Sequence, residues 1–285
     1  MNRRVVVVLG IAILVAACST QGTASPSVAA PSFASVAPSA ASTNPSAQAV
    51  NLTIFGAASL TNVLDKVQDA YAKAHPGTTL TISTDSSAAL ETQIEQGAPA
   101  DVFLAADTIN PKKLVDAHLS AGDAVVFATN RLTIVVPSDN PGGVGSPKDL
   151  AKAGLKIIAA GDAVPITEYA MQLVDQLARQ DGYPTDFASA YAANVVSKED
   201  NVKAIIGKIE IGQGDAGIVY VTDAAASTRV TTVDVPDDAN VPASYAGVVV
   251  GASTHQEPAR TFLGWLTSPD GQAVLKRFGF LPPPR

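Results

Sequence analysis

The sequence has few of the residues from which disulfides, metal sites and nucleic-acid surfaces are built. Its single cysteine, Cys18, cannot form an intramolecular disulfide, so the fold must be stabilised by its core. The three histidines, His75, His118 and His255, lie in separate polar contexts without metal-ligand spacing. With 19 basic and 26 acidic residues, the formal net charge is −7, which argues against nucleic acid or anionic lipid as a partner. We expect a protein without disulfides or cofactors.

The longest apolar run is too short to span a bilayer as a mature helix. It covers Val5–Ala17 and follows Arg3 and Arg4, which is the pattern of a signal peptide. The run ends in Val-Ala-Ala-Cys, which resembles the lipobox of bacterial lipoproteins. The resemblance implies removal of residues 1–17 and acylation of Cys18, so that the chain is anchored at the outer face of the cytoplasmic membrane. The alternative is an ordinary signal peptide with an incidental cysteine.

Charge is also missing from residues 5–64, and residues 19–49 are mostly Ser, Ala, Pro, Thr and Gly. Such a segment cannot bury enough apolar surface to offset the entropy lost on ordering. We therefore predict a disordered tether over 18–49, with a reach of about 30 Å. Without residues 1–17 the chain has 17 basic and 26 acidic residues, a net charge of −9. Any anion bound by the folded part must be held by local dipoles, against this overall charge.

From residue 50 onward, strand and helix patterns alternate. The predicted strands are Leu52–Phe55, Thr79–Ser83, Val102–Leu104, Val125–Ala128, Leu132–Val136, Lys156–Ala159, Ala216–Val221, Val230–Val235 and Tyr245–Val250. The predicted helices are Leu60–Ala74, Ala88–Gln96, Pro111–Ala117, Thr167–Arg179, Asp186–Ala193, Asn201–Gly212, Gln256–Thr267 and Gly271–Phe278. This alternation indicates an α/β fold with mostly parallel strand pairing.

The length of the folded part favours two lobes over one. Two strand patterns are nearly continuous around Thr129–Arg131, and the chain enters another buried run near Pro242–Tyr245. Both places are predicted crossings between lobes. They divide the chain into one lobe of 50–129 plus 243–285 and a second lobe of 130–242, with a ligand cleft between them.

Two stretches place a serine where a strand leads into a helix. Ser59 follows a buried strand and three small residues, and Ser87 follows a polar turn. A serine in this position offers its hydroxyl together with the free N–H groups of the first turn, which favours an anion. The alternative is that each serine is only a helix N-cap, and Asp85 or Ser86 is an equally good cap for the second helix.

Three further stretches offer donors. A proline at the first turn of a helix predicts that the N–H groups of Ile166 and Thr167 point out of the helix end. Residues 197–203 are predicted as an acid-rich helix opening whose last donors lie near Val202. Tyr220 ends a buried strand, where its hydroxyl either faces a ligand or belongs to a half-buried core residue.

Four motifs resemble those of the molybdate-binding protein of ABC importers. They are Phe-x-Ala-Ala-Ser-Leu-Thr-Asn at 55–62, Gln-Ile-Glu-x-Gly-Ala-Pro-Ala-Asp-Val-Phe at 93–103, Gly-Ile-Val-Tyr at 217–220 and the ending Arg-Phe-Gly-Phe at 277–280. The resemblance extends over residues 51–280. It implies a two-lobed periplasmic binding protein fold of type II, with mixed sheets flanked by helices and a tetrahedral oxyanion in the cleft.

Residue by residue, the resemblance implies that Ser59, Ser87, Ile166, Val202 and Tyr220 hold the anion. It implies no catalytic residue, and no metal other than that of the bound molybdate or tungstate. The implied partners are the permease and ATPase of an ABC importer, and we expect a monomer that meets the membrane only through its lipid anchor. The family usually has glycine where this chain has Thr167, so we expect the third donor segment to differ locally.

Other functions remain open at this point. A different tetrahedral oxyanion, tungstate or sulfate, would suit the same neutral donors. A ferric-binding protein would need paired tyrosines and carboxylates, and Tyr220 alone ends a strand here. A secreted serine hydrolase would use Ser59 or Ser87 as nucleophile, but neither lies in a G-x-S-x-G or S-x-x-K pattern. The literal G-x-G-x-x-G at 212–217 follows a predicted helix and precedes a strand, which is the wrong order for a dinucleotide fingerprint.

Overall fold

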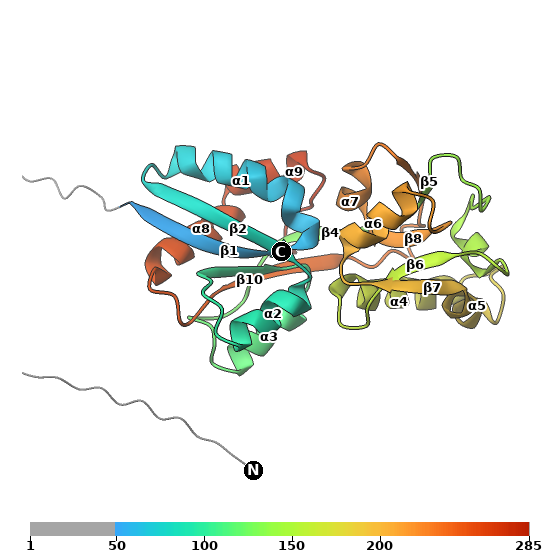
Figure 1. Ribbon diagram of the computed structural model, residues 1–285, viewed down its shortest axis with the longest axis horizontal. Helices are drawn as coiled ribbons and strands as arrows, with labels where there is room; N and C mark the ends of the chain where they lie inside the picture. The colour runs from blue at the N-terminus through green and yellow to red at the C-terminus, as the bar shows by residue number, and fades with distance from the viewer. Residues whose placement is uncertain (1–48, 285) are drawn as a thin grey trace, which may run out of the picture. The chain divides into compact units, whose positions relative to one another are not determined.

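The computed structural model describes residues 49–284, in which strands and helices alternate (Figure 1). The strands are β1 (Val50–Ala57), β2 (Thr78–Asp85), β3 (Val102–Ala105), β4 (Val125–Asn130), β5 (Leu132–Pro137), β6 (Ile157–Ala160), β7 (Val195–Glu199), β8 (Gly217–Tyr220), β9 (Val230–Val233) and β10 (Ala243–Val249). The predicted signal peptide, Cys18 and the tether up to residue 48 lie outside the described residues.

The helices lie between these strands and after the last one. The α-helices are α1 (Thr61–Ala74), α2 (Ser87–Glu95), α3 (Ile109–Asp116), α4 (Pro165–Ala178), α5 (Phe187–Asn194), α6 (Val202–Glu210), α7 (Val221–Ala225), α8 (Gln256–Thr267) and α9 (Pro269–Arg277). Two 3-10 helices, η1 (Ala58–Leu60) and η2 (Pro147–Ala151), complete the set. Within residues 49–284, no helix combines the length and the apolar character that a bilayer crossing requires.

One five-stranded sheet has the order β2-β1-β3-β10-β4. Strands β2, β1 and β3 run parallel, whereas β10 is antiparallel to both β3 and β4. Helices α1, α2, α3, α8 and α9 pack on this sheet or on one another (Figure 1). We call this sheet with these helices the first group. The expectation of mostly parallel pairing is met only in half of it, because β10 enters the sheet from the returning chain.

The remaining strands form the second group, together with α4–α7 and η2. Its three-stranded sheet, in the order β8-β5-β9, is antiparallel throughout, so the parallel expectation is wrong there. Strands β6 and β7 pair in parallel, and a parallel bridge between Ile157 and Ala216 sets β6 beside β8. The backbone N–H of Ile158 donates to the Ala216 carbonyl at 2.9 Å. The resulting lateral order is β7-β6-β8-β5-β9.

The two groups therefore share one topology. In each, three parallel strands (β2-β1-β3 or β7-β6-β8) are followed by two strands of alternating direction. Helix α1 follows β1 as α4 follows β6, and α2 follows β2 as α6 lies between β7 and β8. Helices that follow parallel strands begin at the carboxyl edge of the sheet. Four helix starts thus have equivalent places, two in each group.

Small residues at the end of β1 bring α1 close to the first sheet. A Cβ added at Gly56 would lie 2.5 Å from Leu64 Cδ1, so any larger residue would push the Leu64 side chain aside. Helix α1 buries Val63, Leu64 and Val67 against the strands, as the helical spacing of its apolar residues predicts. The close packing sets where the helix begins, and therefore where Ser59 lies.

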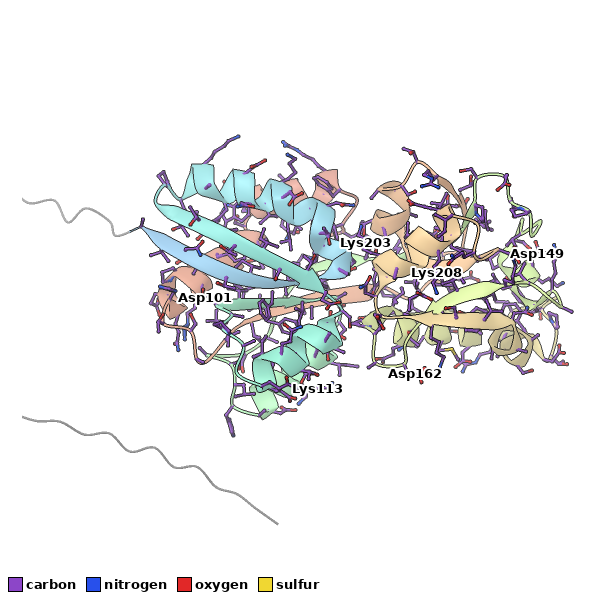
Figure 2. The ribbon with its side chains drawn as sticks, viewed as in Figure 1. Asp101, Lys113, Asp149, Asp162, Lys203 and Lys208 are labelled. Carbon is purple, nitrogen blue, oxygen red and sulfur yellow. The ribbon has the colours of Figure 1, made fainter. Side chains whose placement is uncertain are left out.

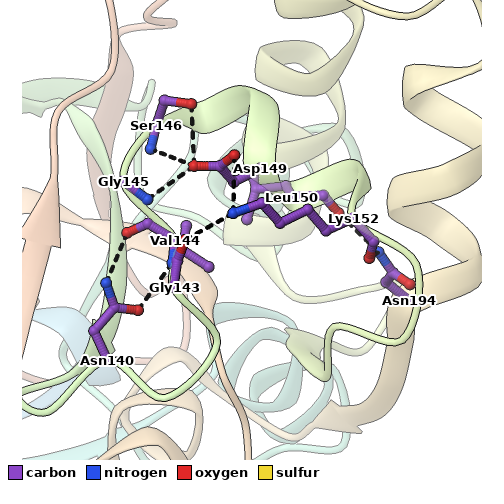
Figure 3. Close-up of polar contacts among 9 residues, drawn as sticks. All are labelled: Asn140, Gly143, Val144, Gly145, Ser146, Asp149, Leu150, Lys152 and Asn194. Atoms are coloured by element: carbon purple, nitrogen blue, oxygen red, sulfur yellow. Dashed lines mark hydrogen bonds and ion pairs between the residues drawn. The ribbon is translucent and has the colours of Figure 1, made fainter.

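One carboxylate organises the connection between β5 and β6 (Figure 3). Asp149 Oδ2 accepts hydrogen bonds from the backbone N–H groups of Gly145 (2.8 Å) and Ser146 (2.9 Å). Lys152 Nζ lies 3.1 Å from the same carboxylate and donates to the Gly143 carbonyl at 2.7 Å. Burial acts to raise the pKa of Asp149, but the hydrogen bonds from Gly145, Lys152 and Ser146 outweigh it and hold the pKa below its ordinary value. Backbone donors of an irregular loop are satisfied in this way.

Two local predictions differ from the structure. The acid-rich helix opening at 197–203 is wrong, because Val195–Glu199 form strand β7 and the helix begins only at Val202. The β-branched Val195 and Val196 favour a strand, which pairs with β6. Helix α7, directly after Tyr220, was not predicted, since its five residues are too short to show a periodic pattern.

Candidate functional site

A small cavity lies where elements of the two groups meet. Its lining residues are Ala57, Ala58, Ser59, Ser86, Ser87, Ala106, Val164, Pro165, Ile166, Asn201, Val202 and Tyr220. All five residues that the sequence singled out as donors are among them. The space open to the centre of a water-sized sphere is only about 10 Å³, far below the roughly 300–1,000 Å³ of sites for drug-sized ligands. A space of this size corresponds to about one water-sized group, so any ligand held here has to be small.

Four helix N-termini surround this cavity. The η1–α1 start and the α2 start come from the first group, and the α4 and α6 starts come from the second. The first backbone N–H groups of a helix lack intrahelical acceptors, and the helix dipole adds partial positive charge at that end. The lining holds no Asp, Glu, Lys, Arg or His side chain. Any positive potential at this point comes from oriented dipoles.

Ser59 is not a helix cap. It lies within η1, whose N-cap is Ala57, and neither η1 nor α1 has a side-chain cap bond. Its side chain is buried, and Ser59 Oγ lies 2.9 Å from the hydroxyl of Tyr245. The capping alternative is therefore excluded for this serine.

Ser87 is not a helix cap either. The N-cap of α2 is Ser86, whose Oγ accepts from the Ala89 N–H at 3.5 Å, and Asp85 Oδ1 accepts from the Ser86 N–H at 2.7 Å. Ser87 Oγ instead accepts a hydrogen bond from the backbone N–H of Ala106 at 3.0 Å. Since a backbone N–H can only donate, the hydroxyl proton of Ser87 remains available to the cavity.

The α4 start presents one backbone donor where the sequence predicted two. Pro165 occupies the first helical position, and the N–H of Ile166 has no acceptor within residues 49–284. The N–H of Thr167 donates to the Val164 carbonyl at 2.9 Å, so the expectation that it points out of the helix end is wrong. The Thr167 hydroxyl donates to the Gly161 carbonyl at 2.8 Å. Threonine thus adds a bond that ties the turn before α4.

The side chain that caps α6 does not bind the backbone N–H of Val202. Asn201 Oδ1 accepts from the Ala204 N–H at 3.1 Å, whereas the N–H of Val202 has no acceptor in the described part of the chain. Two lysines hold this helix in place (Figure 2). Lys208 Nζ lies 2.6 Å from Glu199 Oε1 of β7, and Lys203 Nζ lies 3.2 Å from Asp223 of α7.

Tyr220 closes the cavity with an unused hydroxyl. The residue ends β8, is 1% exposed, and its hydroxyl oxygen has no hydrogen-bond partner among the described residues. Burial raises the pKa of Tyr220 well above its ordinary value, and the neighbouring Tyr245 and Tyr169 act in the same direction. The hydroxyl therefore stays protonated. A buried polar group without a partner costs about 1–3 kcal/mol, so an acceptor that entered the cavity beside Tyr220 would stabilise the protein.

Three tyrosines pack where the groups touch. The ring of Tyr220 lies edge-on to Tyr169 of α4 and to Tyr245 of β10, with centroid distances of 6.4 and 5.6 Å. The Tyr169 hydroxyl accepts from the Ser244 N–H at 3.2 Å. Sequence reasoning missed Tyr245, because it begins a buried apolar run and its contact with Ser59 joins residues 186 positions apart.

Wider hollows share lining residues with the small cavity. One of about 580 Å³ shares Ser86, Val164 and Asn201 with it, and another of about 560 Å³ shares Ser59. The second also includes Arg277 and Phe278–Phe280, the closing motif of the sequence. Among residues 49–284, no three His, Cys, Asp or Glu side chains are grouped so as to hold a metal ion.

Comparison with known proteins gives consistent matches. The sequence model of the family described as bacterial extracellular solute-binding protein matches residues 52–281, which contain all four motifs noted above. The molybdate-binding protein ModA of Mycobacterium tuberculosis (strain H37Rv) is 33% identical over 236 residues, covering 82% of this chain and 86% of that protein.

Solved structures agree on the fold. The substrate-binding domain of a putative molybdenum ABC transporter from Clostridium difficile superposes with a TM-score of 0.62 at 27% identity, covering 82% of this chain and all of that one. The sulfate-binding protein SubI of M. tuberculosis superposes with a TM-score of 0.74 at 21% identity, covering 82% and 87%. The second likeness concerns the fold alone.

Proposed function

Because the chain belongs to the family of bacterial extracellular solute-binding proteins, we propose that it captures molybdate, and tungstate with it, for an ABC importer. The observation that carries the proposal is the cavity itself. Besides Ser86 and Asn201, which cap α2 and α6, it offers the hydroxyls of Ser59, Ser87 and Tyr220 and the open N–H groups of Ile166 and Val202. In the proposed complex all five donate to the oxyanion.

The chemistry of the donors selects among anions. Molybdate and tungstate carry no proton at neutral pH and offer only acceptor oxygens, which match a site of donors. Phosphate keeps a proton at this pH, and a hydroxyl that accepts its O–H has to turn its own proton away from the anion, so that one hydrogen bond to the anion is lost, at a cost of about 1–3 kcal/mol. Sulfate is also an unprotonated dianion, so it has to be rejected by the size of the cavity. Sulfate is the main competing ligand.

Capture is proposed to occur by closure of two lobes, 50–129 plus 243–285 and 130–242. Support comes from the origin of the donors, since Ser59 and Ser87 belong to the first group and the other three to the second. An anion held from both sides links the lobes only when they are closed. Closure also removes water, which strengthens every hydrogen bond to the charge.

A binding role is favoured over hydrolysis. A serine nucleophile needs a base within hydrogen-bond reach of its hydroxyl. Ser59 Oγ instead contacts Tyr245, and Ser87 Oγ accepts from a backbone N–H. Among the described residues, His75 stacks on Tyr71 and His255 lies 3.3 Å from Asp101, so both are engaged elsewhere.

The remaining parts of the proposal concern location and partners. The mature protein is a monomer, anchored by an acylated Cys18 at the outer face of the cytoplasmic membrane, with residues 19–49 as its tether. It delivers the anion to the permease and ATPase of the importer, has no cofactor and needs no nucleic acid. The lipobox-like sequence ending at Cys18 supports the anchor.

Thermal unfolding of the mature protein with molybdate, tungstate, sulfate and phosphate tests the proposal. Ligand at 100 times its Kd stabilises a protein by about 2.7 kcal/mol, so molybdate and tungstate should raise the unfolding temperature and phosphate should not. The absence of a molybdate shift, or a larger shift with sulfate, would overturn the assignment.

The same titration with Ser87→Ala tests whether the cavity is the binding site. Loss of one hydrogen bond to a charged group should weaken molybdate binding by about 1.5–3 kcal/mol. Ser189→Ala, at an exposed serine of α5, is the matched control and should bind as the wild type does.

A further inference from the structure

Tyr245 lies between Ser59 and Asn130, and Asn130 is the last residue of β4, just before the chain continues into β5. Its hydroxyl is 2.9 Å from Ser59 Oγ and 3.4 Å from Asn130 Nδ2, and both Tyr245 and Asn130 are buried. Asn130 Nδ2 also donates to Thr222 Oγ1 at 2.8 Å. A continuous line of hydrogen bonds thus runs from the β4–β5 junction to the cavity.

The direction of this line follows from one backbone donor. The Arg131 N–H donates to Asn130 Oδ1 at 2.9 Å, which fixes the orientation of the amide and turns its NH₂ group toward Tyr245. An NH₂ group can only donate, so the Tyr245 oxygen accepts from Asn130 and sends its own proton to Ser59. Burial raises the pKa of Tyr245 well above its ordinary value, so the proton is present. Ser59 Oγ is then an acceptor toward the protein and a donor toward the cavity.

We propose that Tyr245 is a specificity-determining positioning residue, which makes the binding site favour unprotonated oxyanions by using one lone pair of Ser59 Oγ and turning the Ser59 proton toward the cavity. The inference rests on the proposed function and deepens it. Ser87 is oriented in the same sense by the backbone N–H of Ala106, which no side-chain substitution removes. Ser59 is therefore the serine of this cavity whose direction a side chain controls.

Removing the Tyr245 hydroxyl allows Ser59 Oγ to accept a hydrogen bond from the cavity with the lone pair that Tyr245 had used. In Tyr245→Phe the ring remains packed against Phe127, Tyr220 and Phe280, so the cavity keeps its shape. Ser59 Oγ regains a free lone pair at the cavity wall. A hydrogen phosphate ion then finds an acceptor for its O–H, whereas molybdate gains nothing and loses an oriented donor.

A double-mutant cycle read by calorimetry tests the inference. We expect Tyr245→Phe to weaken molybdate binding about fivefold in the wild-type background, as for a hydrogen bond of ordinary strength. In the Ser59→Ala background the same change should alter Kd by less than about twofold, because the residue through which Tyr245 acts is missing. Equal losses in both backgrounds would show a merely structural role and overturn the inference.

The ratio of molybdate to phosphate affinity is the second readout. It should fall at least about fivefold in Tyr245→Phe and stay unchanged in Tyr71→Phe, a buried tyrosine of α1 that packs on His75, Phe262 and Trp265. Asn130→Asp provides an independent variant that keeps every hydroxyl. A carboxylate there accepts from Tyr245 and so draws the proton away from Ser59, and its charge weakens both anions, so the ratio should again fall.

The outcomes separate the two proposals. A wild-type protein that binds none of the oxyanions overturns the proposed function and this inference with it. A wild-type protein that binds molybdate, combined with an unchanged affinity ratio in Tyr245→Phe and Asn130→Asp, overturns the inference alone.

Discussion

The hydroxyls of Ser59, Ser87 and Tyr220 at the cavity differ in whether another group of the protein bonds to them. Ser59 and Ser87 each accept a hydrogen bond from a neighbour, from Tyr245 and from the Ala106 N–H. The Tyr220 hydroxyl is buried without a partner. Desolvation of this group lowers the stability of the ligand-free protein and is relieved when an acceptor enters the cavity.

Tyr220→Phe should therefore have opposite effects on binding and on stability. Molybdate affinity should fall by about 1.5–3 kcal/mol through loss of a hydrogen bond to a charged ligand, while the free energy of unfolding without ligand should stay the same or rise by about 1 kcal/mol. Calorimetry and urea unfolding measure the two quantities. A variant that loses stability as well as affinity would show that the hydroxyl has a partner in the free protein.

At the scale of elements, the site is a product of repeated topology. The starts of α1 and α4 follow the equivalent strands β1 and β6, and the starts of α2 and α6 follow β2 and β7. Each parallel set brings two helix starts to one edge of its sheet, and the two edges face the same cavity. No element of either group provides a complete site.

The α4 start has Thr167 where the resemblance to the family leads us to expect glycine, and we predict that the effect of this residue is structural. Thr167→Gly should lower the free energy of unfolding by about 1–2 kcal/mol, because it removes the bond to the Gly161 carbonyl and adds backbone freedom in a helix. Molybdate Kd should change less than about threefold, since the donor belongs to Ile166.

Thr167→Val is the matched variant, because it removes the hydroxyl but keeps the branched shape. It should account for most of the lost stability. A tenfold or greater change of Kd in either variant would mean that the Thr167 hydroxyl contributes to anion binding, contrary to its bond with Gly161.

At the scale of the whole molecule, acidic charge dominates and yet the cavity is neutral. The carboxylate of Asp223 is buried beside α6. Lys203 Nζ of α6 lies 3.2 Å from it, but both carboxylate oxygens lack a hydrogen bond of good geometry among the described residues. Burial raises the pKa of Asp223 from 3.8 to about 6, and the attraction of Lys203 opposes this shift only in part. The folded state therefore prefers the protonated carboxyl more than the unfolded chain does.

This preference predicts how stability changes with pH. Because the pKa is higher in the folded state, the contribution of Asp223 is largest below about pH 4 and is lost as the pH rises through about 6, a change of about 3 kcal/mol. Asp223→Asn removes it, so the variant should gain stability relative to the wild type over that interval. Denaturant unfolding at a series of pH values measures the difference.

Asp175→Asn, at an exposed carboxylate of α4, serves as the control and should follow the wild-type curve. A constant difference between Asp223→Asn and the wild type from pH 4 to 7 would contradict the raised pKa.

The sequence by itself determined most of the elements and the α/β class, because these depend on local signals, and its motifs supplied the five candidate donors through the family resemblance. Apolar spacing defines α1, a proline marks the start of α4, and short motifs contain Ser59 and Tyr220. Strand β7 was not predicted, because its sequence continues into acidic residues that we read as a helix start. Helix α7 was too short to show a periodic pattern. Both elements depend on pairing or packing with distant segments.

Only the tertiary structure decided what each donor does. The sequence left open whether Ser59 and Ser87 cap helices, and it offered two N–H groups at the α4 start where the fold leaves one. It gave no sign that Tyr245 and Asn130 orient Ser59. The physical reason is that a hydrogen bond's direction depends on which groups meet in space, and here those groups come from strands and helices far apart in the chain.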